Sequence, residues 1–426
     1  MILELVEPDL QLAADLFDQL QKMSFDGVGI TRDTYGAGEQ RAHDLLAQTA
    51  EALGLQVSRD AALNLYMTLP GRNTFAPQVI TGSHLDSVPR GGNYDGAAGV
   101  LAGIAVLAGW VKAGYQPEIS VTVMAVRAEE SAWFPLSYLG SKAAFGLLND
   151  DSLEVRRFDN QLTLKHHLAA LGGDCKGLIS GVPHLSPANV NCFIELHIEQ
   201  GPILENAGQP LGIVSGICGS LRYRQASVSG HYAHSGATPR LHRKDAVLAA
   251  AELVTGLYQD WIELEAQGHQ LTVTNGQLAT DALQADFSKV SGEVKFCVDF
   301  RSRSLETLEL IDQRLSHRIT TIAACHGVTF TLGAQTRSAP GVMDEALLSL
   351  LQSAADEQNI PAMSLQSGAG HDAALFAAQG VPSAMLFVRN ANGSHNPHES
   401  MDLDDFAAAT RVLGEALKIR SAGGGQ

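Results

Sequence analysis

The sequence is poor in cysteine and has no long apolar run. These two shortages argue against disulfide-bonded, thiolate-zinc and membrane-spanning proteins. Five cysteines are scattered through 426 residues and none belongs to a Cys-x-x-Cys pair, so neither a disulfide framework nor a thiolate zinc site is indicated. No apolar stretch approaches the roughly 20 residues that a membrane-spanning helix needs. The first residues, MILELVEPDLQL, carry acids where a secretory signal would carry Lys or Arg. We therefore expect a cytoplasmic protein.

Positive charge is also scarce. Lys and Arg number 29 against 46 Asp and Glu, which gives a formal net charge of −17 with His neutral. Such a surface repels phosphate, so neither nucleic acid nor an anionic membrane is an expected partner. The glycines of residues 91–99 lack the Gly-x-Gly-x-x-Gly spacing of a dinucleotide site. No Gly-x-Ser-x-Gly elbow of a serine hydrolase occurs either.

Length and residue pattern predict two domains. A chain of 426 residues exceeds the usual size of a single domain. Its first two hundred residues alternate between helix and strand patterns, with helices predicted over 36–54 and 99–111 and strands over 78–81, 120–126 and 192–196. This alternation predicts an α/β catalytic domain with a mixed, mostly parallel sheet flanked by helices.

The pattern changes from about residue 211. Segments 221–229, 271–278 and 292–301 alternate apolar and polar residues, as half-exposed antiparallel strands do, and helical stretches at 243–265 and 305–326 separate them. These elements predict an α+β two-layer sandwich inserted into the catalytic domain.

The α/β pattern resumes near residue 338. An apolar strand is predicted at 381–388 and a last helix from residue 404. The expected boundaries are 1–212 and 333–426 for the two parts of the catalytic domain and 213–332 for the insertion.

Four short segments place His or carboxylate residues directly after an apolar strand, where the sites of α/β sheets assemble. In GSHLDSVPRGGNYDG, His84 and Asp86 lie two residues apart and therefore point to the same side of an extended segment. The acid can then fix the imidazole tautomer for metal binding. Asp95 follows in a glycine-rich loop, where its carboxylate can swing between two ions.

The other three segments supply further ligand types. Glu129 and Glu130 follow the most apolar strand and face different ways, so one can bind a metal while the other acts as general base. His197 in ELHIEQG and His395 in GSHNPHE come after two more apolar strands. Each feature alone fits a turn, a solvated strand end or a core histidine. Together they predict a site for Zn²⁺, Mn²⁺, Co²⁺ or Ni²⁺.

The residues and the spacing of these segments resemble those of the hydantoinase/carbamoylase amidases of the M20 metallopeptidase superfamily. The resemblance runs from GITRDTYGAGE near residue 29 to the last helix, and includes GSHLDSVP, ELHIEQGPILE, HSGATPRLHRKDA, SGAGHDA and SHNPHES. This group contains N-carbamoyl-L-amino acid hydrolases, allantoate amidohydrolases and some β-ureidopropionases. The His of LHIEQG, where peptidase relatives typically carry an acidic ligand, favours the amidase branch.

The resemblance implies roles for the motif residues. The inserted domain would be a lid and the contact of a homodimer, and each subunit would bind two divalent metal ions. Glu129 would be the general base, and Asp86 would orient one metal-binding imidazole. The five implied ligands are His84 and His197 on one ion, Glu130 and His395 on the other, and Asp95 bridging both.

Other motif positions match substrate contacts of the family. His234 matches a histidine that reaches the neighbouring subunit's site and stabilises the oxyanion; the structural alternative is a strand-end histidine bonded to backbone. Arg301 matches an arginine that binds the substrate carboxylate; its alternative is a surface ion pair with Asp299 or Glu293. The remaining substrate-contacting matches are Gln200, Gly370 and His371.

Two segments depart from the family pattern. Residues 131–134 read Ser-Ala-Trp-Phe where relatives commonly have Gly-Ser-Arg-Phe. Ser288 falls where relatives usually place a substrate-binding Asn, and a hydroxyl cannot reproduce the paired donor and acceptor of an amide. We expect the metal chemistry to survive both changes, which bear instead on the identity of the substrate.

The sequence therefore predicts a metal-dependent hydrolase of a linear amide or ureido bond in a small substrate with a free carboxylate. We expect an N-carbamoyl-L-amino acid, hydrolysed to ammonia, carbon dioxide and the amino acid by a metal-activated water. The alternatives are an allantoate or other ureido-acid amidohydrolase and an N-acyl amino acid or dipeptide hydrolase. Retention of Glu129 and of every implied ligand argues against a catalytically silent relative.

Overall fold

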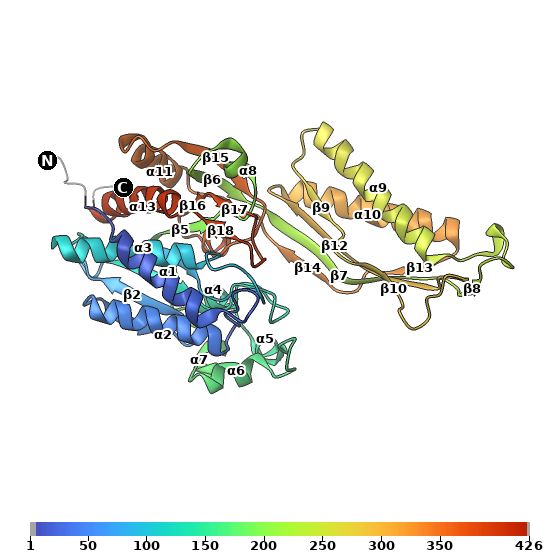
Figure 1. Ribbon diagram of the computed structural model, residues 1–426, viewed down its shortest axis with the longest axis horizontal. Helices are drawn as coiled ribbons and strands as arrows, with labels where there is room; N and C mark the ends of the chain where they lie inside the picture. Colours follow the sequence, from blue (N-terminus) through green and yellow to red (C-terminus); the bar gives the residue numbers. More distant parts are fainter. Residues whose placement is uncertain (1–5, 424–426) are drawn as a thin grey trace. The chain divides into compact units, whose positions relative to one another are not determined.

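The computed structural model describes residues 6–423 and divides into two compact units (Figure 1). Unit 2 is Gly216–Gly341, and unit 1 is formed by the chain before and after it. The unit ends later than the expected residue 332, because β14 (Gln335–Ser338) pairs with β7 (Gly219–Ser229) of the same unit. The N-terminal segment on which the cytoplasmic expectation rests begins with residues 1–5, which lie outside the described part of the chain.

Unit 1 is built on a mixed sheet with parallel strands at its centre. Its strand order is β1-β2-β4-β3-β5-β16-β6-β15. The inner strands β4, β3, β5 and β16 run parallel, while β2 and β6 flank them antiparallel. The carboxyl ends of the four inner strands therefore lie along one edge of the sheet. These inner strands are β4 (Val121–Val126), β3 (Gln78–His84), β5 (Val190–Ile198) and β16 (Ser383–Val388).

The remaining strands of unit 1 are short or lie at the sides. They are β1 (Gln56–Arg59), β2 (Leu65–Leu69), β6 (Leu211–Ile217), β15 (Ala362–Ser367), β17 (Asn390–Ala391) and β18 (Ser400–Met401).

Helices cover both faces of this sheet, as the strand–helix alternation predicted. On one face, Ile194 and Leu196 of β5 join a core with α3 (Ala97–Ala113) and α13 (Leu403–Ser421). The middle of α3 is apolar on every side and is buried on every side. On the other face, Phe193 stacks on Phe376 of α12 (Asp372–Ala378), with ring centroids 3.9 Å apart.

The other helices of unit 1 complete these layers. They are α1 (Leu10–Ser24), α2 (Ala37–Ala52), α4 (Leu139–Ala144), α5 (Asp150–Glu154), α6 (Leu164–Ala170), α7 (Cys175–Ile179), α8 (Ile203–Ala207) and α11 (Glu345–Glu357). Among the described residues, no helix is long and apolar enough to cross a membrane.

Unit 2 pairs an antiparallel sheet with two long helices. Its strand order is β10-β12-β7-β13, with β9 added to β12 and β14 added to β7. Figure 1 shows α9 and α10 packed on one side of this sheet. The apolar residues of β12 that face the helices are Val294, Phe296, Val298 and Phe300, as their alternation predicted.

The elements of unit 2 are β7, β8 (Ala233–His234), η1 (Arg240–His242), α9 (Ala246–Ala266), β9 (Thr272–Thr274), β10 (Leu278–Thr280), β11 (Lys289–Val290), β12 (Glu293–Ser302), α10 (Leu305–His326), β13 (Thr329–Thr331) and β14.

One predicted strand of unit 2 was wrong. Residues 271–278 were expected to form a single strand, but they form β9 and only the first residue of β10. The break faces an irregularity in β12 between Phe296 and Val298. There the side chain of Asn275 donates to the Cys297 carbonyl (3.1 Å), and the Cys297 N–H donates to the Gln277 carbonyl (3.1 Å).

The two ends of unit 2 are joined to each other by backbone hydrogen bonds. The N–H of Ile217 donates to the carbonyl of Gly341, and the N–H of Gly341 donates back to the carbonyl of Ile217, both at 3.0 Å. The chain therefore enters and leaves unit 2 through paired segments.

The aromatic contact between β5 and α12 yields a stability prediction. Phe376→Ala should lower the free energy of unfolding of unit 1 by about 3–5 kcal/mol, because it empties a fully buried site between Phe193 and Phe145. Urea unfolding would measure the change. Phe158→Ala is the control, since Phe158 is 53% exposed and its loss should change stability by less than about 0.5 kcal/mol. Equal effects of the two substitutions would contradict this packing.

Candidate metal centre

The four sequence segments meet at the carboxyl edge of the parallel strands. His84 is the last residue of β3, and His197 is the second to last of β5. Glu129 and Glu130 follow β4 after a two-residue turn, and His395 lies in the loop between β17 and β18. The parallel order of the inner strands thus gathers residues that are far apart in the sequence.

Asp95 lies at the centre of two groups of potential metal ligands. One group is His84, Asp95 and His197, and the other is Asp95, Glu130 and His395; the ligand atoms within each group lie within 4.8 Å of one another. Asp95 Oδ1 is 3.1 Å from His197 Nε2 and 3.5 Å from His84 Nε2. Asp95 Oδ2 is 3.3 Å from His395 Nε2, which is 3.1 Å from Glu130 Oε1. Each oxygen of Asp95 therefore faces a different group.

The tautomers of His84 and His197 are fixed by their other ring nitrogens. His84 Nδ1 lies 3.0 Å from the Asp86 carbonyl oxygen, and His197 Nδ1 lies 2.8 Å from the Ile198 carbonyl oxygen. Each Nδ1 must donate to its carbonyl, which leaves a lone pair on each Nε2. The two Nε2 atoms are 3.4 Å apart and both face Asp95. Lone pairs that converge in a buried site fit a divalent cation.

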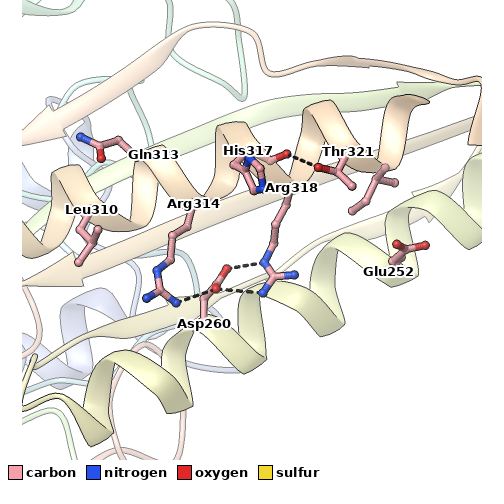
Figure 2. A pocket seen from close by; sticks show the side chains of 9 residues that line it. Glu252, Asp260, Leu310, Gln313, Arg314, His317, Arg318 and Thr321 are labelled. Carbon is pink, nitrogen blue, oxygen red and sulfur yellow. Dashed lines mark hydrogen bonds and ion pairs between the residues drawn. The ribbon is translucent and has the colours of Figure 1, made fainter. Parts of the chain in front are cut away.

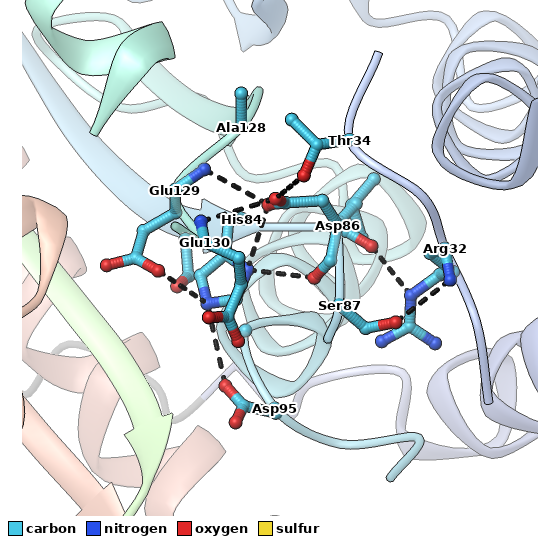
Figure 3. A network of polar contacts seen from close by, with 12 residues as sticks. Arg32, Thr34, His84, Asp86, Ser87, Asp95, Ala128, Glu129 and Glu130 are labelled. Atoms are coloured by element: carbon cyan, nitrogen blue, oxygen red, sulfur yellow. Dashed lines mark hydrogen bonds and ion pairs between the residues drawn. The ribbon is translucent and has the colours of Figure 1, made fainter. Parts of the chain in front are cut away.

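Asp86 joins the first histidine to the pair of glutamates (Figure 3). Its Oδ1 is 3.3 Å from His84 Nδ1 and accepts the N–H of Glu129 at 3.1 Å. Its Oδ2 accepts the N–H of Glu130 at 3.2 Å and the hydroxyl of Thr34 at 2.6 Å. The carboxylate thus ties the end of β3 to the turn after β4, and Thr34 is a contributor that the motif analysis missed.

Burial and neighbouring charge shift the pKa values of these groups in opposite directions. Burial raises the pKa of Glu129 well above its usual value, although the nearby His84 lowers it. Burial also acts to raise the pKa of Asp95, but the neighbouring imidazoles of His197, His395 and His84 hold it well below its usual value. The site therefore favours an ionised Asp95 among the histidines and a readily protonated Glu129 beside them.

A second carboxylate, Glu399, holds the loop that carries Asp95. Glu399 Oε1 accepts the N–H groups of Tyr94 (2.9 Å) and Asp95 (3.2 Å). The hydroxyl of Ser394 lies 2.5 Å from Asp95 Oδ2 and 2.6 Å from Glu399 Oε2, between the two acids. Sequence reasoning missed both residues, although both stand in the SHNPHES motif that supplies His395.

Three of the predicted substrate contacts also lie in unit 1. The side-chain N–H of Gln200 donates to Asp95 Oδ2 (2.8 Å), while Gln200 Oε1 is buried without a hydrogen-bond partner. The ring of His371 packs against the ring of His197, with centroids 4.6 Å apart. Gly370 leaves room for the Tyr138 hydroxyl, which a Cβ at this position would approach to 1.8 Å. Gln200 and His371 therefore border the ligand groups directly.

The other two predicted substrate contacts belong to unit 2. His234 is exposed, and its Nδ1 accepts the N–H groups of Gly236 and Ala237 at 3.1 Å, so the neutral ring carries its proton on Nε2. Arg301 donates from Nε (3.1 Å) and Nη2 (2.9 Å) to Asp299, which is the ion pair anticipated as its structural alternative. The roles of His234 and Arg301 in binding the substrate stay a prediction.

The two segments that depart from the family pattern make local contacts. The indole N–H of Trp133 donates to the Ser87 carbonyl (2.8 Å), and the guanidinium carbon of Arg157 lies 4.6 Å from the centre of its ring. The unusual segment after Glu130 is therefore packed against the β3 end of the site. The hydroxyl of Ser288 is bonded to Asp286 of its own loop (2.5 Å).

Comparison with known proteins decides the family. Residues 80–419 match the model of peptidase family M20/M25/M40. The chain belongs to this family. An N-carbamoyl-L-amino acid amidohydrolase of Geobacillus stearothermophilus is 35% identical over 387 residues, covering 90% of this chain and 92% of the relative. An allantoate amidohydrolase of Escherichia coli is 30% identical over 387 residues, covering 90% and 91%.

Solved structures agree with this family assignment. A hydantoinase/carbamoylase family amidase from Burkholderia ambifaria is 31% identical, with a TM-score of 0.82, and the match covers 98% of this chain and 99% of that one. The resemblance inferred from the sequence motifs is thereby confirmed. This M20 chain is an amidohydrolase, a hydrolase of carbon–nitrogen bonds in linear amides. Members of the family generally bind divalent metal ions, and the two ligand groups are the candidate metal sites of this chain.

Proposed function

We propose that this chain is a binuclear metal amidohydrolase that removes the carbamoyl group from an N-carbamoyl-L-amino acid. One water and the substrate would yield the amino acid, ammonia and carbon dioxide. The observation that carries the proposal is the position of Asp95, whose two oxygens face two separate groups of histidine and carboxylate ligands. The substrate class is suggested by the relative with 35% identity, which is an N-carbamoyl-L-amino acid amidohydrolase.

The donor atoms fit two divalent ions. His84 and His197 would hold one, Glu130 and His395 the other, with Asp95 between them. Nitrogen and oxygen donors without thiolate suit Zn²⁺, Mn²⁺, Co²⁺ or Ni²⁺. When bound, the ions would supply positive charge that lowers the pKa of a water and polarises the substrate carbonyl group.

Glu129 is proposed as the general base. It stands outside both ligand groups, yet its Oε2 is 3.9 Å from His84 Nε2, and it is only 9% exposed. Its carboxylate would take a proton from the attacking water and pass it to the leaving nitrogen. A raised pKa suits both steps, because the group must hold the proton between them. Asp86 would orient His84 and fix the backbone of Glu129 through its N–H.

The substrate side is proposed to use residues of both units. Arg301 would bind the free carboxylate, with Asp299 fixing its guanidinium group. His234 of a neighbouring subunit would donate its Nε2–H to the developing oxyanion, so unit 2 would serve as lid and as dimer contact. The other proposed contacts with substrate are Gln200, Gly370 and His371.

The substrate proposal is tested by product analysis. We expect ammonia from N-carbamoyl-L-amino acids with Mn²⁺ or Co²⁺, no activity after exhaustive chelation, and recovery when metal is restored. The methyl esters of the same compounds should react poorly, because they lack the carboxylate. Faster ammonia release from allantoate would favour the ureido-acid alternative, and amine release from N-acyl amino acids alone would favour the acylase alternative. Full activity in the stripped enzyme would contradict the metal mechanism.

Replacing the proposed base should separate chemistry from metal binding. Glu129→Gln should lower kcat by at least about 100-fold, since general acid–base catalysis is typically worth 10²–10⁴-fold. Metal content, measured by elemental analysis, should match that of the wild type, because Glu129 is outside both ligand groups. A kcat within threefold of the wild type would remove Glu129 from this role.

Mixing two inactive variants tests whether His234 serves a neighbouring site. Glu129→Gln and His234→Ala homodimers should each be nearly inactive. After denaturation and refolding together, heterodimers contain one site with a native Glu129 and a native His234 from the other subunit. We expect about a quarter of wild-type activity to return, with each variant refolded alone as the control. No recovery in proven heterodimers would show that His234 acts within its own subunit or not at all.

A further inference from the structure

The turn that presents Glu129 and Glu130 contains a strained residue. Ala128 is fully buried and has a φ of +57°. This left-handed region is unfavourable for alanine, because its Cβ crowds the following carbonyl group. Such a conformation persists only where neighbouring groups hold it in place.

Successive backbone N–H groups of this turn are held by side chains from other parts of unit 1. The N–H of Arg127 donates to Asn64 Oδ1 (2.8 Å), and the N–H of Ala128 donates to Glu39 Oε1 (2.9 Å). The next two N–H groups, those of Glu129 and Glu130, donate to Asp86. Glu39 therefore takes the N–H at the strained residue itself.

Glu39 is rigidly placed for this contact. It lies in the first turn of α2 and is fully buried. Its Oε2 accepts the N–H of Tyr35 (2.7 Å) and pairs with Arg127 Nη1 (3.0 Å). The side chain of Arg127 is also fully buried and donates to Gln40 Oε1 (2.7 Å) and to the Leu63 carbonyl (3.2 Å). A single carboxylate thus satisfies three donors and fixes both residues that precede Glu129.

We propose that Glu39 is a positioning residue that holds Ala128 in its left-handed conformation and thereby sets the positions of Glu129 and Glu130. The inference rests on the proposed function, in which Glu130 binds one metal ion and Glu129 moves the proton. Glu39 reaches neither group directly and acts through the backbone of the turn. Its loss should therefore disturb the ligand group of Glu130 and His395 and leave that of His84 and His197 in place.

Co²⁺ titration of Glu39→Gln tests this role. Gln has the same shape, but it replaces one acceptor oxygen with an NH₂ group that faces N–H donors. The wild type should bind two Co²⁺ per chain. The variant should bind one of them with near-native affinity and the other at least tenfold more weakly. At saturating Co²⁺, kcat should fall at least tenfold while KM stays within about twofold.

A second substitution tests the backbone route. Adding Ala128→Gly to Glu39→Gln should make the weakened site bind Co²⁺ at least threefold more tightly than in Glu39→Gln alone. Glycine adopts a positive φ without the strain that alanine has there. If Glu39→Gln does not fold, Glu39→Asp gives the same test, since it keeps the charge but shortens the reach to the Ala128 N–H. Two native Co²⁺ affinities in the folded variant, or no recovery with glycine, would overturn the proposal.

Asp260→Asn is the matched control for general destabilisation. Asp260 of unit 2 is also a carboxylate held by arginines, with hydrogen bonds from Arg314 and Arg318 in the pocket between α9 and α10 (Figure 2). This variant should lower the melting temperature without changing the Co²⁺ titration. An equal loss of Co²⁺ in both variants would also overturn the role of Glu39. Failure of the wild type to bind two Co²⁺ would instead contradict the binuclear function itself.

Discussion

The shared position of Asp95 is the constraint on which the site depends. A carboxylate that serves two ligand groups must lie between them, so the strand end that carries His84, the strand end that carries His197 and the loop of His395 must all approach one point. This explains why so many polar contacts serve loop placement. Glu399 and Ser394 fix the loop of Asp95 from one side, and Gln200 contacts its Oδ2.

Acidic side chains outside the two ligand groups are also buried near the site, where they accept hydrogen bonds from several segments. Asp86 and Glu39 use their oxygens to collect backbone N–H groups from the turn after β4. Glu195, two residues before His197, accepts the Ser83 hydroxyl (2.7 Å) and the N–H of Ala373 (2.8 Å). A buried carboxylate is stable where several donors converge on it. Each of these acids therefore connects segments that lie far apart in the sequence.

The convergence of His84, Asp95, Glu130, His197 and His395 could be predicted from the sequence, because their segments come at or after the ends of apolar strands and parallel strands bring such ends together. Their roles as metal ligands stay a proposal. The positions of His84 and His197 at the ends of two parallel strands were enough to predict that they lie close together. The contributions of Glu39 and Thr34 could not be predicted, because they depend on which backbone N–H groups the folded chain leaves facing them. Ala128 gives no sign in the sequence of a positive φ, which glycine or asparagine would have given.

The boundary of unit 2 shows the same limit. β14 reads Gln-Thr-Arg-Ser and contains no apolar residue, so the alternation of apolar and polar residues could not reveal it. It joins the β7 sheet through backbone pairing and through polar side-chain contacts such as that of Ser338 with Ser220. The split between β9 and β10, in contrast, has a sign in the sequence. Asn275 and Gly276, a pair typical of turns, interrupt the alternation that Leu271 and Val273 begin.

The mutual hydrogen bonds of Ile217 and Gly341 hold the two ends of unit 2 side by side. An insertion whose two ends meet can be lengthened, reshaped or exchanged without parting the strands of the host sheet. Unit 2 can therefore diverge between relatives without breaking the strand pairing that gathers the two ligand groups in unit 1.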